Sequence, residues 1–208
     1  PMTVAVEGPA YDVDPLDLQF GAARAQANFH MDQQRVRGGM VLNELALAAL
    51  EPFGVPPLAG TARATLDLAG SPKAPVATLK LDLAKLALDP VTRTKVDANL
   101  QGTLGNGRLE ANLGAQGLGA APLTASAGLP VTFSLSPFAF ALNNDAPLTA
   151  RLNGPLDLAR GASFAALDGV QLRGVLQLAL TVGGTLAGPQ LGGTMALADG
   201  SVQEVTSG

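Results

Sequence analysis

The side chains that most often carry out chemistry are few in this chain. His30 is the only histidine, cysteine is absent, and the serines lie outside any Gly-x-Ser-x-Gly nucleophile motif. His30 alternates with Gln26 and Asn28, a spacing that predicts the polar face of a β-strand and not a general base. We therefore predict that the chain is not an enzyme.

Two further clusters have the composition of ligand sites but not the spacing. Asp12, Asp14 and Asp17 lack the twelve-residue calcium loop with its terminal glutamate, and an exposed acidic loop before a strand explains them. The glycine-rich segment 183–193 lacks the lysine of a phosphate-binding loop, and turn geometry accounts for its glycines. We predict no metal site and no cofactor.

The elements that would position any site are strands, because apolar and polar residues alternate along most of the chain. Turn-forming residues at 105–107, 143–145 and 199–200 favour sequential antiparallel pairing. Two alanine-rich segments, 45–53 and 159–167, break the alternation. We expect each to form a short helix or a crossing segment that covers a sheet edge or lies on the apolar face.

The chain contains an internal repeat with an offset of 114 positions. Gly60, Gly70 and Pro75 correspond to Gly174, Gly184 and Pro189, and leucine positions follow the same offset. We expect two repeat-like units, about 36–90 and 150–204, within a single elongated sheet over residues 1–208. We also expect their hairpins to be equivalent and their apolar faces to be continuous.

Composition excludes several classes. Hydrophobic residues make up 47% of the chain and charged residues 14%, yet no apolar run is long enough for a transmembrane helix. The net charge of −4 and the absence of clustered cations argue against nucleic acid as a partner. The sequence opens at Pro1 without a signal peptide, and we interpret it as an excerpt of a longer protein.

A sheet with one apolar face must cover that face with a second sheet, with membrane lipid around a barrel, or with an apolar ligand. A membrane barrel needs aromatic girdles, whereas tryptophan is absent and Tyr11 is the only tyrosine. Sandwich cores use bulky β-branched and aromatic residues, whereas these faces are mostly leucine and alanine without isoleucine. A smooth leucine and alanine surface suits an acyl chain, although a self-packed structural sandwich, adhesin or spacer remains the alternative.

The repeated sequence pattern resembles that of a known protein family. The segment 183–193, followed by Leu197-Ala198-Asp199-Gly200, is similar to the strand and turn pattern of the TamB family of translocation and assembly module proteins, which are AsmA-like. Segments 42–47, 57–61 and 66–70 resemble the same pattern, and the first copy departs from it at Ser71-Pro72.

The resemblance implies a long, curled, mostly antiparallel sheet that forms an open groove with a hydrophobic interior, a β-taco. It implies a protein in the periplasm of a Gram-negative bacterium, anchored to the inner membrane in its full-length form. Such proteins carry phospholipid between inner and outer membrane and support outer-membrane protein assembly beside a TamA-type barrel, with unfolded outer-membrane proteins as clients. We expect the acyl chains to contact Leu66, Leu68, Leu79, Leu81, Val96, Leu100, Leu109, Leu113, Phe133, Leu135, Phe140, Leu152, Leu176, Leu178, Leu180 and Val182.

Overall fold

The computed structural model describes residues 4–7, 10–88, 94–165, 167 and 170–204. These residues form one antiparallel sheet of 13 strands and two short helical segments. The strands are β1 (Val4–Glu7), β2 (Ala10–Phe20), β3 (Ala23–Met31), β4 (Val36–Ala46), β5 (Ala59–Ser71), β6 (Ala74–Ala87), β7 (Val96–Gly105), β8 (Arg108–Gln116), β9 (Leu123–Leu135), β10 (Phe138–Leu142), β11 (Thr149–Asp157), β12 (Val170–Gly184) and β13 (Pro189–Glu204). The helical segments are η1 (Leu47–Phe53), a 3-10 helix, and α1 (Leu158–Phe164).

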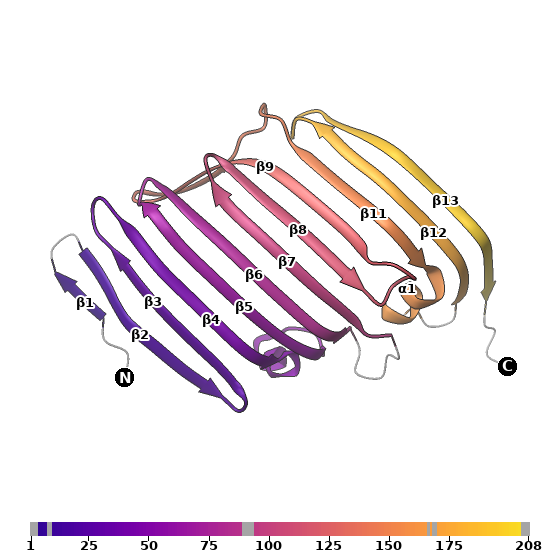
Figure 1. Cartoon of the computed structure of the whole chain (residues 1–208), viewed down its shortest axis with the longest axis horizontal. Helices are drawn as coiled ribbons and strands as arrows, with labels where there is room; N and C mark the ends of the chain where they lie inside the picture. Colours follow the sequence, from indigo (N-terminus) through magenta and orange to yellow (C-terminus); the bar gives the residue numbers. More distant parts are fainter. Residues whose placement is uncertain (1–3, 8–9, 89–93, 166, 168–169, 205–208) are drawn as a thin grey trace.

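The strands lie side by side in chain order in a single layer, from β1 at one edge to β13 at the other (Figure 1). This arrangement confirms the all-β, antiparallel prediction. Sequential pairing fails at one place, because β10 pairs only with β9 and leaves the main sheet, so that β9 pairs with β11.

Local turn chemistry explains the connection between β7 and β8. β7 and β8 are joined by Asn106 and Gly107, which both have positive φ (52° and 72°), as a two-residue hairpin turn that matches strand twist requires. After β10, the Asp145 amide donates to Asn143 Oδ1 at 3.2 Å, which closes the expected turn at 143–145.

The expected turn at Asp199-Gly200 is wrong. Both residues lie inside β13, where the pairing with β12 shifts between Arg173 and Val175. The positive φ of Asp199 (52°) therefore serves a β-bulge, which is the other common use of that conformation in a sheet.

Both expected short helices are present, with slightly different bounds. η1 joins β4 to β5 and ends at Gly54, which has a positive φ of 82°. α1 joins β11 to β12, and the Asp157 carboxylate accepts hydrogen bonds from the Ala159 and Arg160 amides at its N-terminus. The two segments lie at the same end of the strands and leave both faces of the sheet uncovered along most of its width (Figure 1).

The β5–β6 and β12–β13 hairpins pair in the same register after a shift of 114 positions. Leu66 faces Leu79 in the first hairpin. Their counterparts, Leu180 and Gly193, face each other in the second. The equivalence of the two hairpins therefore extends from the sequence to the pairing of individual residues.

Both hairpins also contain a bulge at the same position. In the first, Gly60 and Lys85 have positive φ values of 117° and 55°. In the second, the corresponding Gly174 and Asp199 have values of 116° and 52°. Bulges bend and coil a sheet, so each repeat bends at an equivalent place.

The sheet is open, and its surface area is correspondingly large. The chain exposes 13179 Å², whereas a compact monomer of 20.9 kDa would expose about 9,000 Å². Among the residues with described side chains, buried hydrophobic positions are few, and no large side chain is fully buried. A conventional closed core is therefore absent from the described part of the chain.

Candidate functional site

The most distinctive feature of the molecule is a pair of apolar rows that run across the strands on one face. Each row is a series of directly paired residues, one per strand of the main sheet from β2 to β13, without β10. The first apolar row is Leu18, Ala25, Leu42, Ala64, Leu81, Leu100, Leu113, Ala125, Leu152, Leu180 and Gly193. The second apolar row is Leu16, Ala27, Met40, Leu66, Leu79, Gly102, Ala111, Ala127, Ala150, Val182 and Leu191.

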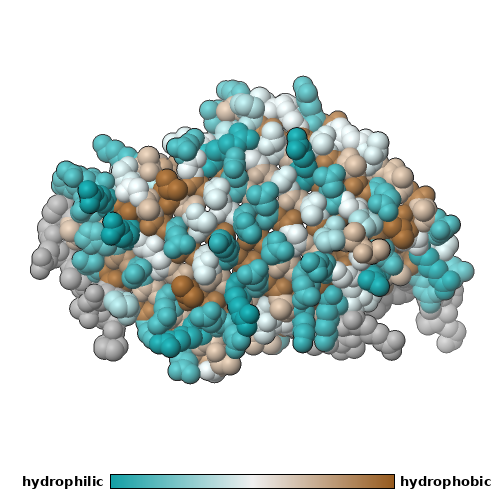
Figure 2. All heavy atoms as spheres, in the orientation of Figure 1, coloured by the Kyte–Doolittle hydropathy of each residue, from teal (hydrophilic) through white to brown (hydrophobic). Residues whose placement is uncertain are grey.

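Between these rows lies a polar row whose side chains point to the opposite face, because successive strand residues alternate. It consists of Asp17, Gln26, Val41, Thr65, Lys80, Gln101, Asn112, Ser126, Arg151, Thr181 and Gly192. Figure 2 shows hydrophilic side chains spread across this face of the sheet. The sheet is thus amphipathic over its full width, and its apolar side contains no charged residue in either row.

The apolar face is the concave one. Along β3 the apolar positions are half-buried while the polar positions between them are exposed, and β7 shows the same alternation. Bulges near one end of β4, β5, β6 and β12 bend the sheet, and the lower exposure of the apolar side agrees with a curl toward that side. The result is an open groove with an apolar lining.

The structure places all the predicted lipid-facing residues on the apolar side of their strands. Thirteen lie on the main sheet, namely Leu66, Leu68, Leu79, Leu81, Val96, Leu100, Leu109, Leu113, Leu152, Leu176, Leu178, Leu180 and Val182. The remaining three, Phe133, Leu135 and Phe140, lie where β9 and β10 leave it. These three are therefore near one end of the groove and not along its length.

The β9–β10 hairpin crosses one end of the sheet. β9 passes the β7–β8 turn, where the Val131 amide donates to the Gly107 carbonyl at 2.9 Å. It then reaches the β5–β6 turn, where the Leu135 amide donates to the Pro72 carbonyl at 2.7 Å. Phe133 packs edge-to-face on Phe138 and Phe140, with centroid distances of 6.2 and 6.5 Å.

Sequence reasoning missed the contribution of β2 to β4 to the groove. Leu18, Leu42 and Met40 lie in the two apolar rows but were not among the predicted contacts. The available signal was the alternation itself, which in β3 is as regular as in β7.

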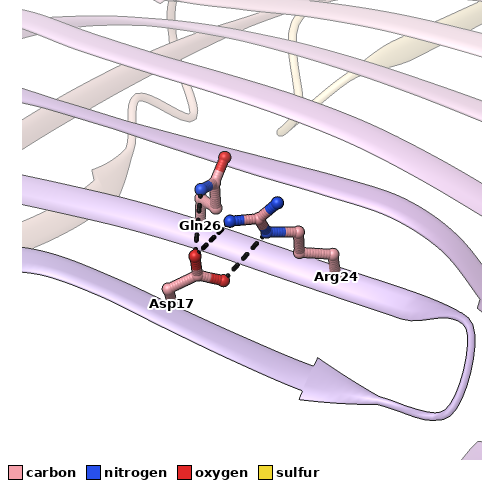
Figure 3. Close-up of polar contacts among 3 residues, drawn as sticks. All are labelled: Asp17, Arg24 and Gln26. Carbon is pink, nitrogen blue, oxygen red and sulfur yellow. Dashed lines mark hydrogen bonds and ion pairs between the residues drawn. The ribbon is translucent and has the colours of Figure 1, made fainter. Parts of the chain in front are cut away.

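The polar face is held by exposed hydrogen bonds and ion pairs. Asp17 on β2 accepts from Arg24 Nε at 3.0 Å and from Gln26 Nε2 at 3.2 Å, both on β3 (Figure 3). The Arg24 hydrogen bond lowers the pKa of the Asp17 carboxyl below its usual value. The acidic residues therefore belong to a strand, and the expected acidic loop before a strand is wrong.

The remaining sequence candidates lie on the same polar face or at its end. His30 Nδ1 lies 3.2 Å from Asp12 Oδ2, and His30 Nε2 lies 3.7 Å from Asp32 Oδ2. Nearly half of the His30 side chain is exposed. Hydrogen bonds from the Gln34 and Arg35 amides lower the pKa of Asp32, which fixes the β3–β4 turn. Across the described residues, no group of three or more possible metal ligands converges.

No family model, no curated protein and no solved structure matches the chain. Neither helical segment of the described chain is long and apolar enough to cross a membrane. The function is therefore inferred from the geometry and chemistry of the groove.

Proposed function

We propose that the concave apolar face is a non-enzymatic groove that carries the acyl chains of phospholipid. The observation that supports this proposal is the pair of unbroken apolar rows from β2 to β13, which face solvent on a curled single-layer sheet. Large exposed apolar surfaces mark sites that bind something apolar. In this proposal the chain is part of a TamB-like protein of the Gram-negative periplasm, anchored at the inner membrane, that moves lipid to the outer membrane.

The composition of the rows supports transport better than tight binding. A methylene removed completely from water contributes about 0.8 kcal/mol, but an open groove covers an acyl chain from one side only. Leucine, alanine and glycine offer no directional contacts, so adjacent positions along the groove bind a chain with similar strength. Weak, repeated and nearly equal sites are what passage along a conduit requires.

The distribution of charge bears on where the headgroup of a bound lipid would lie. The charged side chains of the three rows, Asp17, Lys80 and Arg151, all lie in the polar row on the convex side. A lipid in the groove would therefore keep its headgroup in water at the open side. We expect the groove to accept zwitterionic and anionic phospholipids alike.

The same groove could shelter apolar strands of unfolded outer-membrane proteins, in keeping with assembly beside a TamA-type barrel. Lipid is the better-supported cargo, because the rows lack polar groups that would pair with a peptide backbone. An unfolded chain laid across them would find no hydrogen-bond partner on the apolar face, so its amides and carbonyls would have to stay paired with water on the open side.

Site-specific photo-crosslinking tests the proposal. A photoreactive residue replaces Leu178, in the groove on β12, or the adjacent Gln177, on the opposite face. After purification from cells and irradiation, mass spectrometry should find phospholipid attached at position 178 and little at position 177. Leu100 and Gln101 on β7 form a second matched pair.

Two results would contradict lipid carriage. Equal labelling at 177 and 178 would mean that lipid binds without preference for the groove. Crosslinks at 178 that join two chains, with no lipid adduct, would instead support a structural domain whose apolar faces pack on each other.

A further inference from the structure

The β9–β10 hairpin gathers exposed aromatic residues at one end of the groove. Of the seven phenylalanines in the sequence, Phe133, Phe138 and Phe140 lie in this hairpin. Phe138 and Phe140 are 75% and 57% exposed, and Leu142 on the same strand is 45% exposed. Single apolar residues on a surface are normal, whereas a contiguous exposed group is typical of a contact site.

These side chains share one face of the hairpin, which we call the aromatic face. It consists of three directly paired sets, namely Leu135 with Phe138, Phe133 with Phe140, and Val131 with Leu142. β9 runs from the main sheet into the hairpin without a register shift, so these β9 residues stay on the side of Ala125 and Ala127 in the apolar rows. The aromatic face therefore continues the lining of the groove past the ends of β6, β7 and β8 (Figure 1).

The charge around the aromatic face indicates what kind of surface it fits. The sequence has no charged residue between Glu110 and Asp145, so the whole hairpin is uncharged. Beside it lies the exposed Lys73, which follows Pro72, the residue whose carbonyl accepts from the Leu135 amide. Phenylalanine and leucine with a flanking lysine are typical of segments that lie in a membrane interface. A protein partner is usually met by a rim of hydrogen-bonding groups around the apolar patch.

The free backbone of β10 limits how deeply the hairpin enters a membrane. Within the described residues β10 pairs only with β9, so its outer amides and carbonyls have no strand partner. The hydrocarbon core of a bilayer does not tolerate such an open edge. The backbone of β10 must therefore stay among the hydrated headgroups while the phenylalanine rings reach the acyl chains.

We propose that the aromatic face docks on the surface of a lipid bilayer and inserts Phe138, Phe140 and Leu142 between its lipids. Because this face continues the groove, docking places one end of the groove against the membrane, where acyl chains pass between the two. That passage rests on the proposed function, whereas the membrane contact itself rests on the hairpin alone. The contact depends on apolar insertion and needs no anionic lipid.

Vesicle flotation with the 208-residue chain tests the contact. The chain should float with vesicles of phosphatidylcholine alone nearly as well as with vesicles that also contain phosphatidylglycerol, and salt should have little effect. Phe138→Ser and Phe140→Ser should each weaken vesicle binding by about tenfold, because each removes one inserted ring. Phe53→Ser is the matched control, since Phe53 is 81% exposed on η1 at the other end of the strands. It should leave vesicle binding unchanged, and all three variants should keep the circular dichroism of the parent protein.

A fluorescent label measures insertion directly. The chain has no cysteine, so Leu142→Cys and Ala141→Cys each provide a single site for an environment-sensitive dye and keep both exposed rings of β10. Position 141 lies on the opposite face of β10 from position 142. On vesicles the emission should shift to the blue at position 142 and much less at position 141.

Several results would overturn the membrane contact. These are equal weakening by Phe53→Ser, equal emission shifts at 141 and 142, and a shift at 142 that grows with protein concentration without vesicles, because the occupant would then be a second copy. Flotation without a lipid adduct at Leu178 would contradict lipid carriage and support the membrane contact. A lipid adduct at Leu178 without flotation would contradict the membrane contact alone.

Discussion

The two equivalent hairpins share sequence pattern, register and bulge, yet they differ in their surroundings. β5–β6 lies in the middle of the sheet, between β4 and β7, whereas β12–β13 lies at its edge, where no further strand of the described residues pairs with β13. Leu81 of β6 is half-buried, while its counterpart Met195 in β13 is 65% exposed. Pairing within a hairpin is therefore specified locally, whereas burial depends on the strands that come next.

The strands that precede the two hairpins differ in a second way. Leu42 of β4 faces Ala64, but its counterpart Leu156 of β11 faces Leu176, a shift of two positions from the repeat. Because side chains alternate with a period of two, this shift keeps the apolar residues on the same face. The amphipathic pattern thus tolerates changes in register that preserve parity, which allows a sheet to be extended strand by strand.

The largest expected difference concerns the bulge glycines. A Cβ atom at Gly60 would lie 2.7 Å from the Ala84 carbonyl oxygen, and one at Gly174 would lie 2.8 Å from that of Ala198. Gly60→Ala should destabilise the protein by about 2–4 kcal/mol, since β6 is held from both sides. Gly174→Ala should cost about half as much, because β13 can move outward.

Urea unfolding measures both effects. Gly102→Ala is the matched control, since its φ is ordinary and its Cβ would meet no atom closer than 3.8 Å. It should be neutral or stabilise the protein by about 0.4–1 kcal/mol. Equal losses for Gly60→Ala and Gly174→Ala would show that β13 is as confined as β6.

The next difference concerns charge on the apolar face. Leu81→Asp should cost about 1–3 kcal/mol, because apolar contact is lost but water reaches the carboxylate from the open side of the groove. Met195→Asp should change stability by less than about 0.5 kcal/mol, as for most exposed sites. Gln101→Asp on the convex face is the control and should also be nearly neutral.

Thermal and urea unfolding of these three variants test the openness of the groove as well as the edge. A loss above about 4 kcal/mol for Leu81→Asp would indicate a closed interior, in which an unpaired charge is buried. A loss for Met195→Asp as large as that for Leu81→Asp would indicate that β13 is covered.

The strands could be predicted because the alternation acts residue by residue. The turn at Asn106-Gly107 and the two alanine-rich segments were equally local signals, and both kinds of prediction are confirmed. Asp199-Gly200 was misread as a turn because positive φ serves turns and bulges alike. Only the pairing with Gly174 on the neighbouring strand distinguishes the two.

The departure of β10 from the main sheet could not be read from the sequence. β10 has the same alternation as its neighbours, and its removal from the main sheet depends on where β9 meets Pro72, more than sixty positions away. The shape of the groove likewise follows from curvature summed over many strands. The residues that line it were predictable as a face, but their distribution between groove and end hairpin was not.

The smallest expected difference concerns the side chain that caps the interior bulge. Asp97→Ala removes the acceptor of the Lys85 amide and should destabilise the protein by about 1 kcal/mol, the usual worth of one hydrogen bond. Asp97→Asn keeps an acceptor oxygen and should restore most of that loss. Asp67→Ala, an exposed carboxylate on β5 without a side-chain hydrogen bond in the described chain, controls for the change in net charge.

Amide hydrogen exchange at Lys85 and at Asp199 would show whether the Asp97 side chain protects the first bulge and leaves the second unprotected. In the parent protein the Lys85 amide should exchange more slowly than the Asp199 amide, because an acceptor covers only the first. Asp97→Ala should bring the two rates together while the amides of Leu66 and Leu180 keep their protection. If the Lys85 rate stayed unchanged in Asp97→Ala, the bulge would be protected by the β6–β7 pairing itself and not by the Asp97 cap.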